Sequence, residues 1–122
     1  MRHLPLLLLT CTVMTACATG TGASCATFAR AGVEATVLDK SGQRVCNADV
    51  MAMTATTMEP LAPAPGSNAS NCAYVGLYEK PGTWIIHATG AGLPDGLTST
   101  VTIGLDPTGC HVVQQFVTLQ VK

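Results

Sequence analysis

The feature that most limits the fold is a run of alternating residues near the C-terminus. Positions 98, 100 and 102 are all threonine, and apolar or small residues occupy the odd positions between them: Leu97, Ser99, Val101, Ile103 and Leu105. Successive side chains of a β-strand point to opposite faces, so this pattern predicts a strand with one face in a core.

Shorter alternations recur along the chain. Val33, Ala35 and Val37 alternate with polar residues, which predicts a first strand over residues 33–38. We expect a second strand over residues 45–53, a third over 72–79 and a fourth over 84–89. The inward side chains would be Ala48, Val50 and Ala52 in the second strand, and Trp84, Ile86 and Ala88 in the fourth.

The last strand is expected over residues 110–121. Val117, Leu119 and Val121 share one of its faces, while Val112 and Phe116 lie on the other. A bulge near Gln114 and Gln115 would turn both sets inward, because a bulge inserts one extra residue into a strand.

Turn residues separate these strands. Pro81 and Gly82 suit the two central positions of a type II turn before the fourth strand. Residues 54–71 contain three prolines and no usable periodicity, which predicts a long loop. Together these patterns predict an all-β fold: a single antiparallel β-sandwich of about seven strands, Ig-like in outline, over residues 31–122.

The charge balance excludes one large class of function. Only 11% of the 122 residues are charged, and the formal net charge is −1. A protein that binds nucleic acid through its phosphates needs a basic face, so no nucleic-acid partner is expected.

The N-terminus predicts export. Arg2 precedes an apolar stretch over residues 4–9, and small residues follow, as in a signal peptide over residues 1–16. The sequence Met-Thr-Ala-Cys at 14–17 resembles the lipobox of bacterial lipoproteins, in which the cysteine is lipidated. Cys17 would then anchor the protein to a membrane of the bacterial cell envelope, with residues 17–30 as lipidated N-terminus and tether. Ordinary secretion with cleavage after Ala18 is the alternative.

The cysteines agree with export. Six are present, at positions 11, 17, 25, 46, 72 and 110. Cys25, Cys46, Cys72 and Cys110 remain under either cleavage, which predicts two disulfides. If successive strands simply alternate in direction, Cys25 pairs with Cys72 and Cys46 with Cys110. The long loop need not reverse the chain, so the alternative of Cys46–Cys72 with Cys25–Cys110 stays open.

The order of several motifs resembles the carboxypeptidase regulatory-like domain. These motifs are the first strand, the segment Arg-Val-Cys-Asn-Ala-Asp-Val at 44–50 and the segment Pro-Gly-Thr-Trp at 81–84. The cysteine segments at 72–76 and 110–112 are similar to a lipoprotein branch of that family. The resemblance covers about residues 31–121. It implies a prealbumin-like (transthyretin-like) β-sandwich and no catalytic residues.

The remaining candidates for chemistry are few. His87 is expected on the outer face of the fourth strand, and His111 is next to Cys110 but on the opposite face of its strand. We therefore expect neither an enzyme nor a bound cofactor. Met51, Met53 and Met58 are either packing residues or ligands for a soft metal such as Cu(I).

Two classes of function remain. The first is a non-catalytic binding or structural module on the cell envelope, which contacts an unidentified partner through a sheet edge or the loop at 54–71. The second is a periplasmic carrier of a small ligand or of copper.

Overall fold

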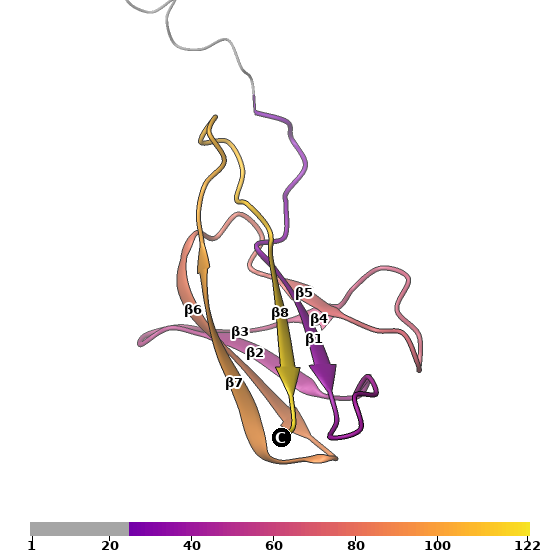
Figure 1. Cartoon of the computed structure of the whole chain (residues 1–122). Helices are drawn as coiled ribbons and strands as arrows, with labels where there is room; N and C mark the ends of the chain where they lie inside the picture. The colour runs from indigo at the N-terminus through magenta and orange to yellow at the C-terminus, as the bar shows by residue number, and fades with distance from the viewer. Residues whose placement is uncertain (1–24) are drawn as a thin grey trace, which may run out of the picture.

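The computed structural model describes residues 25–122, which form an all-β sandwich as the alternating patterns predict (Figure 1). The described part contains eight strands in two four-stranded sheets. None of its residues forms a helix that could span a membrane. The expected signal peptide and Cys17 lie outside the described residues.

The first sheet contains both ends of the domain. Its strand order is β4-β5-β1-β8, and its strands are β1 (Val33–Leu38), β4 (Ala62–Pro63), β5 (Tyr74–Gly76) and β8 (Gln115–Gln120). β1 pairs antiparallel with β5 but parallel with β8, so one pair departs from the antiparallel sandwich expected.

The second sheet is antiparallel throughout. Its order is β3-β2-β6-β7, and its strands are β2 (Asp49–Met53), β3 (Met58–Pro60), β6 (Gly82–Gly90) and β7 (Leu93–Ile103). β6 and β7 form a long hairpin. Their turn lies at residues 91–92, and Gly92 supplies its positive φ of 82°.

The core lies between the sheets and is built from the predicted alternations. Val50 and Ala52 are buried, and so are Trp84, Ile86 and Ala88, while Ala48 is partly buried against them.

One polar group within this core is held by hydrogen bonds. The Tyr74 hydroxyl donates to the Val45 carbonyl at 2.8 Å and accepts from the Ala48 amide at 3.0 Å. A buried hydroxyl needs such partners to offset its lost hydration.

The two ends of the sandwich contain different disulfides and chain ends. We call the end where β1 and β8 begin the Cys25 pole, and the end where both strands finish the Cys46 pole. Figure 1 shows the residues after Cys25 entering at the first end and the C-terminus lying at the second.

The segment at 54–71 is not the unstructured loop that its prolines predict. It contains β3 and β4, which extend one edge of each sheet. Leu61 connects the two strands; its side chain is buried, and its amide donates to the Val50 carbonyl at 2.8 Å. Because edge strands tolerate proline, the three prolines did not prevent pairing here.

The turn before β6 lies earlier than the Pro81–Gly82 position predicted. The Lys80 amide donates to the Leu77 carbonyl at 3.2 Å, and Glu79 takes the positive φ of 54°. Gly82 already belongs to β6. Glu79 accepts this uncommon conformation because its carboxylate is held by groups from two other segments, described below.

The expected inward turn of the last strand is only half right. Val112 is fully buried and forms a bridge with Leu105 before β8 begins. Phe116, in contrast, is 73% exposed. The parallel register with β1 places Phe116 opposite Glu34 on the outer face of the sheet, so no bulge carries it inward.

Both disulfides form, but with the alternative pairing. The bonds are Cys25–Cys110 and Cys46–Cys72, so the pairing of Cys25 with Cys72 and Cys46 with Cys110 is wrong. The added strands β3 and β4 change the direction of every strand that follows. β5 therefore starts at the Cys46 pole, which brings Cys72 to Cys46, and β8 starts at the Cys25 pole, which brings Cys110 to Cys25. Two disulfides indicate an oxidising environment outside the cytoplasm.

Candidate functional site

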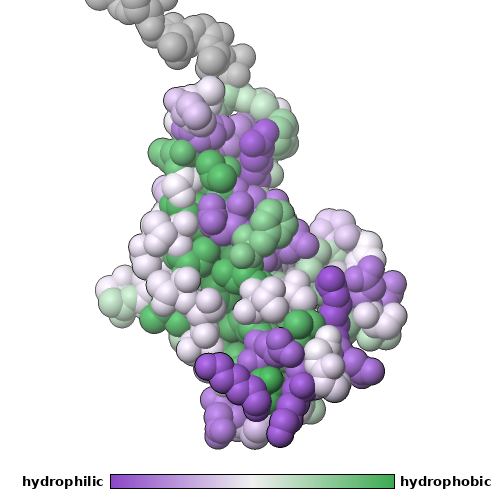
Figure 2. Space-filling view, in the orientation of Figure 1, coloured by the Kyte–Doolittle hydropathy of each residue, from purple (hydrophilic) through white to green (hydrophobic). Residues whose placement is uncertain are grey.

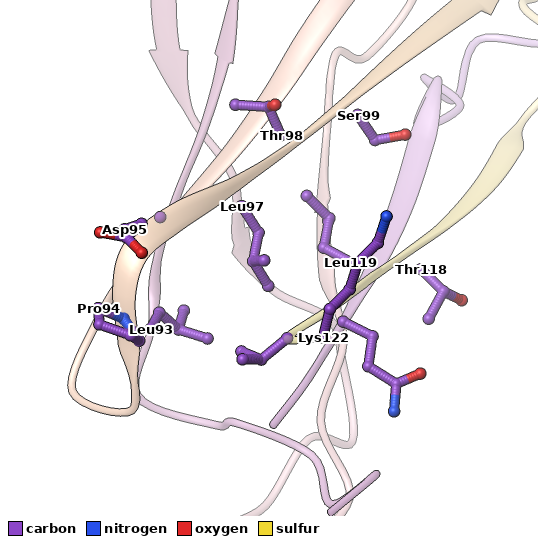
Figure 3. A pocket seen from close by; sticks show the side chains of 12 residues that line it. Leu93, Pro94, Asp95, Leu97, Thr98, Ser99, Thr118, Leu119 and Lys122 are labelled. Atoms are coloured by element: carbon purple, nitrogen blue, oxygen red, sulfur yellow. The ribbon is translucent and has the colours of Figure 1, made fainter. Parts of the chain in front are cut away.

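One hollow of the domain lies along its open side. β7 and β8 are the edge strands of the two sheets on the same side of the sandwich, and no strand of the described chain covers them. A groove of about 470 Å³ runs between them at the Cys46 pole (Figure 3). Its walls are residues 93–99 and residues 118–122.

The groove combines an apolar floor with polar margins. The buried side chains of Leu93 and Leu119 form part of its floor, and Figure 3 shows Leu97 in the space between the two strands. Thr98 and Thr118 add hydroxyl groups at the margins. Its volume lies within the range of small-ligand sites, and both walls are strand edges with backbone groups free to pair. The groove can accept an extended peptide or a small amphipathic ligand.

A second cluster lies at the Cys25 pole around His111. The His111 Nδ1 lies 2.8 Å from Glu79 Oε1, which also accepts the Arg30 backbone amide at 2.7 Å. The Phe28 ring stacks on the imidazole with centroids 5.2 Å apart and 9° between planes. The Arg30 guanidinium lies over the Phe28 ring, 5.5 Å from its centroid.

Electrostatics in this cluster favour the charged carboxylate. The hydrogen bond from the Arg30 amide, followed by the contact with His111, lowers the pKa of Glu79 below its usual value. His111 is buried, and its Nε2 has no hydrogen-bond partner among the described residues. Cys110, beside it, is held in a disulfide and provides no thiolate.

The arrangement fastens the chain rather than activating a nucleophile. Residues 25–30, expected in the tether, are held to the rest of the sandwich by a disulfide, a ring stack and a hydrogen bond. Sequence analysis missed the Glu79–His111 contact, which joins positions 32 residues apart. No local pattern marks such a contact.

The three methionines lie together on the outer face of the second sheet. Val50 and Ala52 point into the core, so Met51 and Met53 point outward. The strand register places Met53 opposite Met58 on β3 and Met51 opposite His87 on β6. Opposite residues on one sheet face have Cβ atoms about 5 Å apart. His87 points outward as predicted, and its Nε2 reaches over Gly96 of β7.

The described residues hold no cluster of three histidine, cysteine, aspartate or glutamate side chains suited to a metal ion. A soft metal at the outer face would therefore depend on the methionine sulfurs and His87.

Comparisons with protein-family models, curated proteins and solved structures give no match for this chain.

Proposed function

We propose that this chain is a non-catalytic lipoprotein of the bacterial cell envelope, with a β-sandwich of the carboxypeptidase regulatory-like type that acts as a binding module. In this proposal Cys17 carries the lipid, and the groove between β7 and β8 receives the partner. The observation that carries the proposal is that Cys25, which follows Cys17 closely in the sequence, lies at one pole, while the groove lies at the other.

The Cys25 pole supports an anchoring role. Cys25 is cross-linked to Cys110, and the sequence places it eight residues after Cys17. Eight residues span at most about 28 Å when fully extended. A lipid on Cys17 would therefore keep this pole close to the membrane.

The groove lies at the other end of the molecule. β1 and β8 run parallel from the Cys25 pole, and the groove is formed where β8 ends and β7 begins. Anchored at Cys17, the domain would present its open edge away from the lipid. A partner segment in extended conformation could then add to the free edge of β7 or β8.

The anchor is tested by mass and partition. The full chain is exported in a bacterial host, and the intact mass of the mature protein is measured. We expect an N-terminal Cys17 with an added acyl mass and recovery in the detergent phase. The Cys17→Ser variant should lose both. A mature protein that begins at Thr19 without lipid would refute the anchor.

The groove is tested by photo-crosslinking in cells. A photoreactive residue replaces Ser99 or Thr118, which line the groove, and Thr102 serves as the control because it lies on β7 outside the groove. We expect crosslinked partner bands at the first two positions and not at the third. Equal bands at all three would contradict a binding role for the groove.

A second candidate function is a carrier of Cu(I). The observation that favours it is the register that brings Met51, Met53 and Met58 onto one face beside His87. Thioether sulfur and imidazole nitrogen are ligands that Cu(I) accepts.

Titration with Cu(I) against a competing chelator decides this candidate. The Met51→Leu/Met53→Leu double variant should lose binding at least tenfold if the face is a copper site, since leucine keeps the volume but removes the sulfur. His87→Gln should weaken binding, and His111→Gln, remote from this face, should not. Absence of binding by the natural sequence removes the carrier.

A further inference from the structure

Exposed apolar side chains gather at one end of the sandwich. Among the described residues, seven large hydrophobic side chains are exposed, and five of them lie at the Cys25 pole: Phe28, Tyr78, Leu105, Val113 and Phe116. The topology brings them together, since they lie just before β1, after β5, after β7 and at the start of β8. Figure 2 shows hydrophobic surface interspersed with polar surface at this end.

The pole is built to keep these side chains outside the core. Leu105 and Val113 flank a two-stranded arm closed by the Leu105–Val112 bridge and by a hydrogen bond from the Val113 amide to the Gly104 carbonyl. The Cys25–Cys110 disulfide fixes the arm to the entering chain. A rigid projection that exposes apolar groups marks an interaction surface rather than incomplete packing.

Arg30 adds a positive charge beside this surface. Its guanidinium lies over the Phe28 ring, and it takes part in neither of the two ion pairs of the described chain, which join Lys80 to Glu59 and His111 to Glu79. The Glu79 carboxylate, which accepts the Arg30 backbone amide, is also in contact with His111. Apolar side chains beside a free cation suit the boundary between acyl chains and anionic headgroups.

We propose that the Cys25 pole rests on the surface of a lipid bilayer, with Phe28, Leu105 and Val113 in the headgroup region. This proposal rests on the lipid anchor at Cys17. Cys25 follows Cys17 by eight residue steps, which have a typical span of roughly 16 Å, and tethering of this kind gives effective concentrations on the order of millimolar. A patch too weak to bind vesicles by itself therefore engages the membrane once anchored. In this orientation the strands extend away from the bilayer, and the groove lies at the pole farther from the membrane.

Quenching by brominated lipids tests the contact. The lipidated full-length mature protein is reconstituted in vesicles of phosphatidylethanolamine and phosphatidylglycerol, with or without brominated acyl chains. The reporter is Val113→Trp, and the control is Lys122→Trp at the opposite pole. Native Trp84 is buried and contributes the same background to both. We expect at least twofold stronger quenching for the Val113→Trp reporter.

A matched pair of surface variants sharpens the test. Leu105→Ser, in a protein carrying the Val113→Trp reporter, should reduce quenching by at least half. Ile85 lies on the outer face of the second sheet and is 43% exposed, against 53% for Leu105. The Ile85→Ser variant should leave quenching unchanged. Equal quenching at Val113 and Lys122 would overturn the proposal. Crosslinking of two copies through the pole, without quenching, would assign this surface to a dimer instead.

Failure of the anchor can be separated from failure of the contact. If the mature protein carries no lipid on Cys17, the proposed anchor fails. A chain that begins at Cys17 is then coupled through that thiol to a maleimide lipid in the same vesicles, because the other four cysteines are held in disulfides. Strong quenching of the Val113→Trp reporter on this sample supports the membrane contact, and weak quenching rejects it.

Discussion

The two poles of the sandwich differ in how far apart in the sequence their hydrogen-bonded residues lie. Each pole has a disulfide and a carboxylate held by hydrogen bonds. At the Cys25 pole Glu79 joins segments 49 and 32 residues away, to Arg30 and His111. At the Cys46 pole the Asp39 carboxylate accepts from Ser41 and Gln43, two and four residues along the chain.

This difference separates long-range closure from local turn formation. The contacts of Glu79 exist only when β5, the 104–113 arm and the entering chain have all assembled. The contacts of Asp39 need only a turn of the kind that aspartate favours. We therefore expect stability to depend more strongly on the Cys25 pole.

The largest expected effect comes from the disulfides. The Cys25–Cys110 bond closes 85 residues and the Cys46–Cys72 bond closes 26. Chain-entropy reasoning gives about 4.6 kcal/mol for the first and about 3.5 kcal/mol for the second. Urea unfolding of the two double-alanine variants measures the losses. A larger loss of unfolding free energy for the Cys46–Cys72 pair would contradict the expectation that stability depends more strongly on the Cys25 pole.

The next effect concerns a glycine at each pole. A Cβ on Gly32 would lie 2.7 Å from the Leu77 carbonyl oxygen and 2.8 Å from Ile103 Cδ1, and the backbone atom cannot easily give way. We expect Gly32→Ala to cost about 1–3 kcal/mol by overpacking. Gly42 has room for a Cβ but a φ of +84°, so Gly42→Ala should cost about 1 kcal/mol through strain alone. Thermal denaturation compares them, and equal losses would mean that the Cys25 pole is less tightly packed than described.

Acid should begin to act on the Glu79 and Asp39 carboxylates at different pH values. The pKa of Glu79 is lowered by the Arg30 amide and then by His111, and the pKa of Asp39 is lowered mainly by the Ser41 hydroxyl. A carboxylate with a lowered folded-state pKa stabilises the fold above its ordinary pKa, and this contribution is lost as pH falls through the folded value. The loss should begin near pH 4.5 for Glu79 and near pH 3.8 for Asp39.

Melting temperatures between pH 6 and pH 2 follow these losses, with Glu79→Gln and Asp39→Asn as the two variants. Glu79→Gln should remove the loss that begins near pH 4.5, and Asp39→Asn should remove only the loss that begins near pH 3.8. Identical curves for the two variants would contradict the different starting pH values expected for Glu79 and Asp39.

The smallest expected effect is a single proteolytic cut. Residues 64–71, which lead into the Cys46 pole, are mostly exposed and carry mainly local hydrogen bonds. Limited proteolysis should cut there before it cuts the 104–113 arm, which a disulfide fixes. The fragments should stay joined through Cys46–Cys72, with little change in melting temperature. First cleavage within the arm would contradict the expectation that the Cys25 pole resists proteolysis better than residues 64–71.

The sequence alone determined the class of fold and the inward faces of most strands. Alternation at Val33, Ala35 and Val37, and again at Trp84, Ile86 and Ala88, is a local property, because a strand side chain's face depends only on its position in the strand. The four disulfide cysteines also followed from counting and from the expected export.

Only the tertiary structure decided how these strands meet. Two short strands in the segment at 54–71 set the direction of β5 and β8, and that direction chose Cys46–Cys72 and Cys25–Cys110. The parallel register of β8 with β1 left Phe116 outside, and distant partners fixed the turn at Glu79. The same assembly created the open groove and the apolar pole. Strand direction and long-range contacts depend on the whole chain, so no local pattern could carry them.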